Sequence, residues 1–166
     1  KRHDLLVEAV SILHREGTVD PGNLRLSFIG DGTQRQSIQQ LIRERKVHNI
    51  CRIVPYMAQE KLWEIMQISD LLCHPTEYEG LGKIVIESMM MGLPVLVSNV
   101  TPLNELICHG HTGFLSDNTA ECWANELRTI ISERSERSKV SEPARQLALE
   151  RYTPENNGKR YAEQFA

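Results

Sequence analysis

Residues 70–98 read DLLCHPTEYEGLGKIVIESMMMGLPVLVS, and this stretch decides the fold. The apolar run from Asp70 to Cys73 predicts a short buried strand. A helix is expected from about Gly82 to Met91, because Gly92 fits the position that follows a helix end. Pro94 to Ser98 predicts a second buried strand. A strand, a helix and a strand in close succession are typical of a parallel βαβ unit.

The same alternation continues on both sides of this unit. Further strands are expected at 24–29, 50–54 and 113–115, and further helices at 5–13, 59–69, 102–107 and after Thr33 as N-cap. From Thr119 onward we expect helices, interrupted by a charged linker at Glu133–Ser141, with a last helix after Thr153-Pro154-Glu155. Strands that alternate with helices in this way predict an α/β fold, a Rossmann-like parallel sheet flanked by helices.

Composition excludes several classes of protein. The chain has 166 residues, of which 40% are hydrophobic and 25% charged, so a folded domain is expected rather than a disordered chain. A net charge of −3 argues against a general nucleic-acid binder. The sequence holds no apolar run of the ~20 residues that span a bilayer. The 4 cysteines show no CxxC pairing, which indicates reduced thiols in a cytoplasmic protein and argues against a zinc site.

The predicted topology also places a binding site. In doubly wound parallel sheets, ligands bind beyond the carboxyl ends of the strands. The connections at 30–32, 55–57, 75–82 and 99–101 all follow predicted strands, so they meet at that edge. We therefore expect the functional residues to lie in these four loops.

The loop that ends at Gly82 carries the most informative chemistry. Free backbone N–H groups at the start of the following helix form an anion site, and Gly80 and Gly82 allow a ligand close to the backbone. Glu79 precedes the helix and Glu87 lies about one turn inside it, where a carboxylate could accept two vicinal hydroxyls of a ribose. Amides that bind an anion, beside two carboxylates that accept hydrogen bonds from hydroxyl groups, are complementary to a nucleotide diphosphate sugar.

Residues 79–95 resemble a known family signature, the EGFG…LEAMAxGxPV segment of retaining glycosyltransferases with the GT-B fold. The resemblance continues in Phe28–Gly32, which is similar to the family's vGdG turn, and in Asn104–Leu115, which is similar to its xEvvxdGxxGxL segment. Lys1–Leu6 and Arg151–Asn156 resemble the segments that open and close this half of the family's fold. Five segments in the right order are far more specific than one glycine motif.

The resemblance implies a role for individual residues. Glu79 matches the glutamate beside the donor sugar and Lys1 matches the lysine that binds the donor diphosphate, so these two are the expected catalytic residues. Glu87 matches the glutamate that binds the ribose hydroxyls. The full set of expected donor-binding residues is Gly30, Gly32, Arg52, Ile53, Val54, Gly80, Leu81, Gly82, Lys83, Ile84 and Glu87. Within that set, the stretch from Arg52 to Val54 matches the contact with the base.

The resemblance also implies an organisation for the whole enzyme. Residues 1–166 would form one nucleotide-sugar-binding domain, with 136–166 as its C-terminal helical extension. The family's first strand and its acceptor-binding half would precede Lys1, so we expect this chain to be a fragment of a longer enzyme. No metal is required, and the partner is a nucleotide-sugar donor rather than nucleic acid. The expected location is the cytoplasm, with any membrane contact at its inner face and through the absent half.

Other functions stay open at this point. A non-catalytic nucleotide-sugar-binding module and a nucleotide-sugar epimerase of the same architecture would share these motifs, whereas a transferase would serve polysaccharide or glycolipid synthesis. Individual residues have plainer interpretations too: Arg52 and Lys83 could face solvent, and the turn at Gly30–Gly32 could be only a tight connection. We interpret His74, which precedes a proline, as a structural residue.

Overall fold

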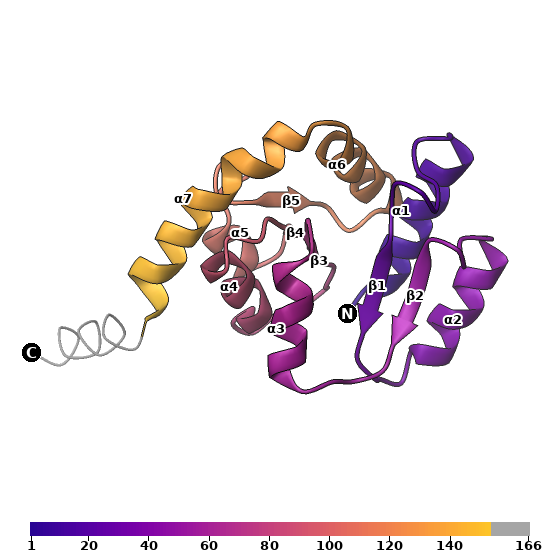
Figure 1. Cartoon of the computed structure of the whole chain (residues 1–166), viewed down its shortest axis with the longest axis horizontal. Coiled ribbons are helices and arrows are strands. Elements are labelled where there is room, and N and C mark those ends of the chain that lie inside the picture. The colour runs from indigo at the N-terminus through magenta and orange to yellow at the C-terminus, as the bar shows by residue number, and fades with distance from the viewer. Residues whose placement is uncertain (154–166) are drawn as a thin grey trace, which may run out of the picture.

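The computed structural model describes residues 1–153 and contains helices and strands in regular alternation (Figure 1). The strands are β1 (Leu26–Ile29), β2 (Cys51–Val54), β3 (Leu72–His74), β4 (Val95–Ser98) and β5 (Phe114–Ser116). The helices are α1 (His3–Arg15), α2 (Arg35–Glu44), α3 (Gln59–Gln67), α4 (Lys83–Met90), α5 (Leu103–Leu106), α6 (Ala120–Ser132) and α7 (Arg134–Tyr152). The predicted α/β fold with parallel strands and flanking helices is confirmed.

All strand pairs are parallel, as expected, but the described strands form two sheets. One sheet contains β1 and β2, and the other has the order β3-β4-β5. The start of the chain lies between the two sheets: the N–H of Arg2 donates to the carbonyl of Pro75 at 3.0 Å, just beyond β3. On the other side, the ring of His3 lies 5.4 Å from that of Phe28 in β1. The first residues are therefore held at the carboxyl edge of both sheets.

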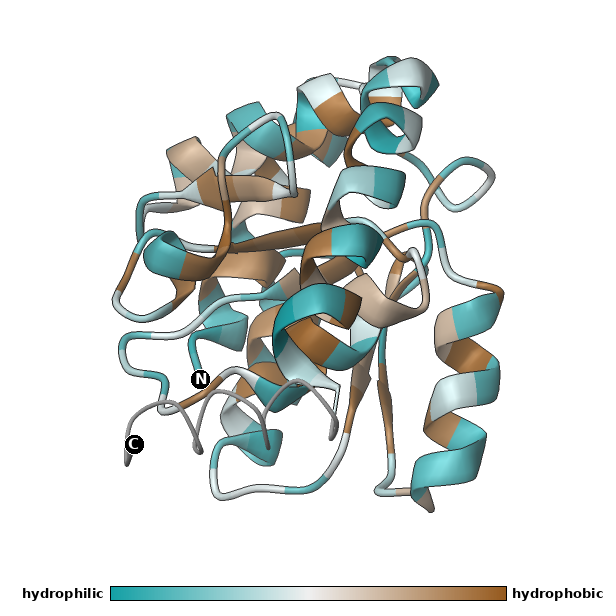
Figure 2. Ribbon diagram, turned by 90° about the vertical axis from the view of Figure 1, so that its left-hand side faces the viewer, coloured by the Kyte–Doolittle hydropathy of each residue, from teal (hydrophilic) through white to brown (hydrophobic). Residues whose placement is uncertain are grey.

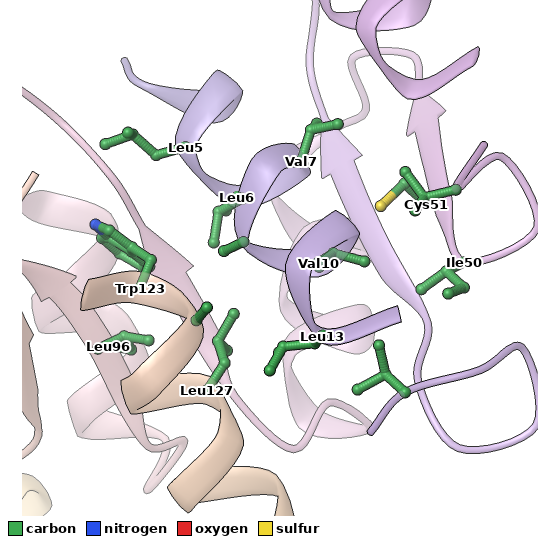
Figure 3. Close-up of a cluster of buried hydrophobic side chains, with 14 of the residues drawn as sticks. Leu5, Leu6, Val7, Val10, Leu13, Ile50, Cys51, Leu96, Trp123 and Leu127 are labelled. Carbon is green, nitrogen blue, oxygen red and sulfur yellow. The ribbon is translucent and has the colours of Figure 1, made fainter. Parts of the chain in front are cut away.

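The hydrophobic core has two parts (Figure 2, where the strands and inner helix faces are coloured as hydrophobic). The first part joins α1 to α6 and to the strands β1, β2 and β4. In Figure 3, Leu6 of α1 and Trp123 of α6 lie next to each other, with Leu96 of β4 below Trp123. All three side chains are at most 2% exposed. Full burial of such a side chain contributes roughly 1.5–3 kcal/mol, so this contact anchors α1 and with it the start of the chain.

The second part of the core packs α4 against β4, α5 and α7. Val85 and Met89 lie one turn apart on α4 and are completely buried. Gly92 follows this helix with φ of 74°, the left-handed conformation that glycine adopts without strain, as the sequence predicts. This packing fixes the position of the first turn of α4 relative to the sheet.

Two local predictions are wrong. Thr33 does not cap α2: the N–H of Arg35 donates to the carbonyl of Gly32, so Thr33 and Gln34 form a turn before the helix begins. Glu133–Ser141 is not a linker, since it belongs to α7.

The reason for the second error is tertiary packing. Val140, Ala144 and Ala148 repeat every fourth position and are at most 1% exposed, so α7 is ordered by its contact with the rest of the core. Its numerous charged residues cover the other faces. The helix predicted after Thr153-Pro154-Glu155 lies outside the described residues, and the single-domain assignment with an extension at 136–166 stays a prediction.

Candidate active site

The turn that leads into α4 is shaped by Gly82. This residue is the N-cap of α4 and has φ of 69°, and a Cβ atom there would lie 2.8 Å from Cδ2 of buried Leu103. The carbonyl of Gly82 accepts the N–H groups of Val85 and Ile86, and no side chain among residues 1–153 caps the helix. The amides of Lys83 and Ile84, at the very start of the helix, therefore remain available to an anion, as expected for this loop.

Lys1, His74 and Glu79 meet at this turn. Nζ of Lys1 forms an ion pair with Oε2 of Glu79 and lies 3.1 Å from Nε2 of His74. Nε2 of His74 lies 2.6 Å from the same carboxylate oxygen, and the N–H of Gly80 donates to Oε1 of Glu79 at 3.1 Å. The two residues that were expected to be catalytic are thus in direct contact, although 78 positions separate them in the chain.

These contacts set the protonation of the cluster. Burial would raise the pKa of Glu79, but the hydrogen bonds from Lys1 and His74 outweigh burial and lower its pKa to about 2. Burial lowers the pKa of His74 by more than the hydrogen bond with Glu79 raises it, and the charge of Lys1 adds a smaller lowering effect. At neutral pH the cluster therefore consists of an ionised carboxylate, an ammonium group and a neutral imidazole. Because an ionised carboxylate only accepts hydrogen bonds, Nε2 of His74 is the donor to Glu79.

Glu87 lies one turn into α4 and is held by a different helix. Gln59 Nε2 donates to Oε1 of Glu87 at 3.0 Å, and Trp63 Nε1 donates to Oε2 at 3.1 Å. Lys83, on the same helix as Glu87, places its Nζ 3.5 Å from Oε1, so its side chain turns toward the carboxylate. The side chain of Glu87 is 17% exposed, which leaves the carboxylate accessible at one edge.

The carboxyl ends of β1 and β2 carry four further expected residues, Gly30, Gly32, Ile53 and Val54. The N–H of Gly30 donates to the carbonyl of Val54 at 3.0 Å, which places the turn at Gly30–Gly32 beside the end of β2. Asp31 accepts the N–H of Tyr56 at 3.0 Å and joins the two loops. The side chain of Arg52, by contrast, donates to Ser27 Oγ at 2.8 Å, within the sheet and before its carboxyl edge. Ile53 and Val54 are half-buried and Gly80 and Leu81 are exposed.

A buried polar network that the sequence analysis did not identify supports the loop before Glu79. Ser98, at the end of β4, accepts the N–H of Thr76 at 2.8 Å and donates to Oδ1 of Asn118 at 2.6 Å. Asn118 in turn donates to the carbonyl of Thr76 at 2.9 Å. Both Ser98 and Thr76 are at most 1% exposed. The one available signal was a serine at the end of an otherwise apolar strand. Gln59 and Trp63 carried no such signal, because both lie on an exposed face of a helix.

The fold and this site together define a class of protein: residues 1–153 have the α/β architecture of GT-B glycosyltransferases, with one glutamate before the start of α4 and a second one turn into it. The chain belongs to the family of glycosyl transferases group 1, whose sequence model matches residues 1–147.

Two curated relatives illustrate the family. An alpha-D-kanosaminyltransferase of Streptomyces kanamyceticus is 27% identical over 149 residues, covering 89% of this chain and 37% of that enzyme. A D-inositol 3-phosphate glycosyltransferase of Corynebacterium urealyticum is 28% identical over 138 residues, covering 82% of this chain and 32% of that enzyme. The chain thus spans about a third of the length of these relatives.

Solved structures confirm the fold. The crystal structure of the Anabaena protein HepE in complex with UDP and glucose superposes with a TM-score of 0.86 over 99% of this chain and 44% of HepE, at 22% identity. In the described part of the chain, no helix is long and apolar enough to cross a membrane. Residues 1–153 also contain no group of three or more His, Cys, Asp or Glu side chains arranged to hold a metal ion.

Proposed function

We propose that this chain is the donor-binding part of a retaining glycosyltransferase, which moves a sugar from a nucleotide diphosphate sugar to an acceptor hydroxyl. One observation carries the proposal: Lys1 and Glu79 form an ion pair at the uncapped start of α4, the helix that also holds Glu87. The cation of Lys1 lies beside a short segment that holds free amides and two carboxylates, and this combination fits the parts of a nucleotide sugar. A diphosphate needs positive charge, and sugar and ribose hydroxyls need acceptors.

Catalysis in this proposal is electrostatic. Cleavage of the donor leaves negative charge on the diphosphate, and Lys1 together with the first amides of α4 would stabilise that charge. Glu79, held by Lys1, His74 and the N–H of Gly80, would accept hydroxyls of the donor sugar and fix its position. Protein cations and amides perform the task of a divalent ion in this scheme, so the proposed reaction needs no metal.

The nucleotide would extend from this turn toward β2. Glu87 would bind the ribose, and the turn at Gly30–Gly32 and the end of β2 would lie near the base and phosphates. Arg52 donates a hydrogen bond to Ser27 within the sheet. In this proposal the base is therefore contacted by the backbone at Ile53 and Val54. UDP is the first nucleotide to test, since the crystal structure of HepE contains UDP.

The other parts of the proposed enzyme are outside this chain. We propose that an acceptor-binding half and a further strand precede Lys1, and that the product is a polysaccharide or a glycolipid. A cytoplasmic location with access to the inner face of the membrane would suit a glycolipid acceptor. Relatives of about three times this length are consistent with such an additional half.

Nucleotide titration followed by amide NMR shifts tests the donor site. The chain should respond to one of UDP, GDP or ADP, with shifts confined to residues 30–32, 53–56 and 79–87. Glu87→Gln should lower the affinity for that nucleotide by about tenfold, as expected for a charge-assisted hydrogen bond worth about 1.5–3 kcal/mol. The intact protein should release the same nucleoside diphosphate from its sugar donor when acceptor is present. Shifts elsewhere, or no response in the intact protein, would refute the proposal.

A further inference from the structure

We propose that Trp63 and Gln59 are positioning residues that orient Glu87 toward the ribose and so set the preference for a ribonucleotide donor. This inference rests on the proposed function, because it assigns a role to the neighbours of the predicted ribose acceptor. Both residues belong to α3, outside every segment that resembles the family signature.

Helix geometry explains why α3 holds both oxygens of Glu87. Gln59 and Trp63 are four residues apart, so their side chains leave the same face of α3, one turn from each other. Gln59 Nε2 reaches Oε1 at 3.0 Å and Trp63 Nε1 reaches Oε2 at 3.1 Å. One donor on each oxygen fixes the plane of the carboxylate, which a single donor would leave free to rotate.

The two contacts leave acceptor capacity for a ligand. An ionised carboxylate has about four lone-pair sites, and the two side chains of α3 use two of them. The remaining sites suit two vicinal hydroxyls, one on each oxygen. Nζ of Lys83 lies 3.5 Å from Oε1, so a cation also borders the carboxylate. The carboxylate of Glu87 is therefore held in one orientation and can still accept hydrogen bonds from a ligand.

The exposure of Trp63 supports a function beyond packing. Its side chain stays 37% exposed on a helix whose inward position is filled by buried Met66. More than a third of its surface therefore faces solvent instead of the core. Its indole N–H nevertheless donates to a carboxylate at the predicted donor site. A tryptophan suits this role because its rigid ring holds the polar N–H in a fixed direction.

The test compares ligands that differ only in the ribose. The affinity of the intact protein is measured by calorimetry for whichever of UDP, GDP and ADP binds best, and for its 2′,3′-dideoxy analogue. Trp63→Phe keeps an aromatic ring and removes the N–H donor. It should lower the affinity for the ribonucleotide by about fivefold, which corresponds to part of the energy of one charge-assisted hydrogen bond. Gln59→Leu should act in the same direction. Both variants should leave the dideoxy analogue unchanged, as should the exposed neighbour Glu64→Gln with either ligand.

The outcomes separate this inference from the proposed function. An equal loss for both ligands would mean that Trp63 acts on the base or on folding, and an unchanged or higher ribonucleotide affinity would mean that it does not orient Glu87. Either result overturns the inference. Glu87→Gln serves as the reference, because it should abolish most of the difference between the two ligands. If it does so while Trp63→Phe has no effect, only the inference fails. If it does not, the proposed role of Glu87 fails and the inference fails with it.

Discussion

Nε2 of His74 lies 2.6 Å from Oε2 of Glu79, and the same oxygen pairs with Nζ of Lys1. The contact joins the last residue of β3 to the loop before α4. The ion pair with Lys1 also ties the start of the chain to this loop. His74 thus does more than precede a proline, the structural role that we expected from the sequence. It holds the carboxylate that we propose to face the donor sugar, so its protonation state affects both stability and the site.

The pH dependence of stability should report on His74. Burial lowers its pKa below 6.5 in the folded protein, so the unfolded chain takes up a proton first and stability falls as the pH drops through about 6.5. His74→Gln removes this contribution and retains a donor for Glu79. We expect the melting temperature of the variant to fall less between about pH 7.5 and 5.5 than that of the parent.

The comparison isolates His74. Burial also lowers the pKa of His3, but His3 is present in both proteins, so this burial effect cancels, and a smaller lowering effect of His74 on His3 is removed together with His74. Glu79 contributes in another window: with its pKa lowered from 4.5 to about 2, its stabilisation is present above about pH 4.5 and is lost as the pH falls toward 2. If the melting temperatures of parent and variant fell by the same amount between about pH 7.5 and 5.5, the assignment to His74 would be contradicted.

Gly82→Ala should destabilise the fold, whereas Gly80→Ala should not. The backbone of Gly82 is left-handed, which costs other residues roughly 1–2 kcal/mol, and the new methyl group would also meet Leu103 at 2.8 Å. At Gly80 a Cβ atom would meet nothing within 4 Å, so a change below about 0.5 kcal/mol is expected. Urea unfolding of the two variants measures the difference. Equal midpoints would show that the turn can rearrange around Gly82.

Ser98→Ala should weaken the loop that carries Glu79. The change leaves the buried N–H of Thr76 without its acceptor, a cost of about 1–3 kcal/mol, and removes the donor to Oδ1 of Asn118. Ser88→Ala is the matched control: Ser88 is also completely buried, but its hydroxyl donates to the carbonyl of Ile84 within α4. That carbonyl lies inside a helix, so little should be lost. Denaturant unfolding and nucleotide affinity should both distinguish the variants, and identical effects would argue against a role of Ser98 in the loop.

Alkylation should rank the four cysteines by their surroundings. All four are free thiols, as the lack of CxxC pairing indicated. Burial raises the pKa of Cys51 and of Cys73 to about 12, so these two should react last with iodoacetamide. Exposed Cys108 should react first, with half-buried Cys122 between. Mass spectrometry of a time course at about pH 8 gives the order, and early labelling of Cys51 would indicate opening of the core around β2.

Local sequence features predicted most of the elements and half of the site. Gly82 and Gly92 marked the two ends of α4 because a left-handed backbone strongly favours glycine. The order of the strands and helices followed from hydrophobic runs of suitable length. The error at Glu133–Ser141 has the opposite cause: three small or apolar residues among many charges are a weak periodic signal, and the helix is ordered by packing on α4.

The sequence by itself determined the alternation of elements, the glycine turn before α4 and the positions of Lys1, Glu79 and Glu87 as candidate residues. The alternation and the glycine turn depend on backbone conformation and on spacing within short segments, which neighbouring residues control, whereas the role of Lys1 was implied by the family resemblance. Only the tertiary structure decided which side chains meet: Lys1 with Glu79 and His74, and Trp63 of α3 with Glu87. Such contacts join residues that are far apart in the chain, and they form because burial of the core brings separate elements together, which no local pattern records.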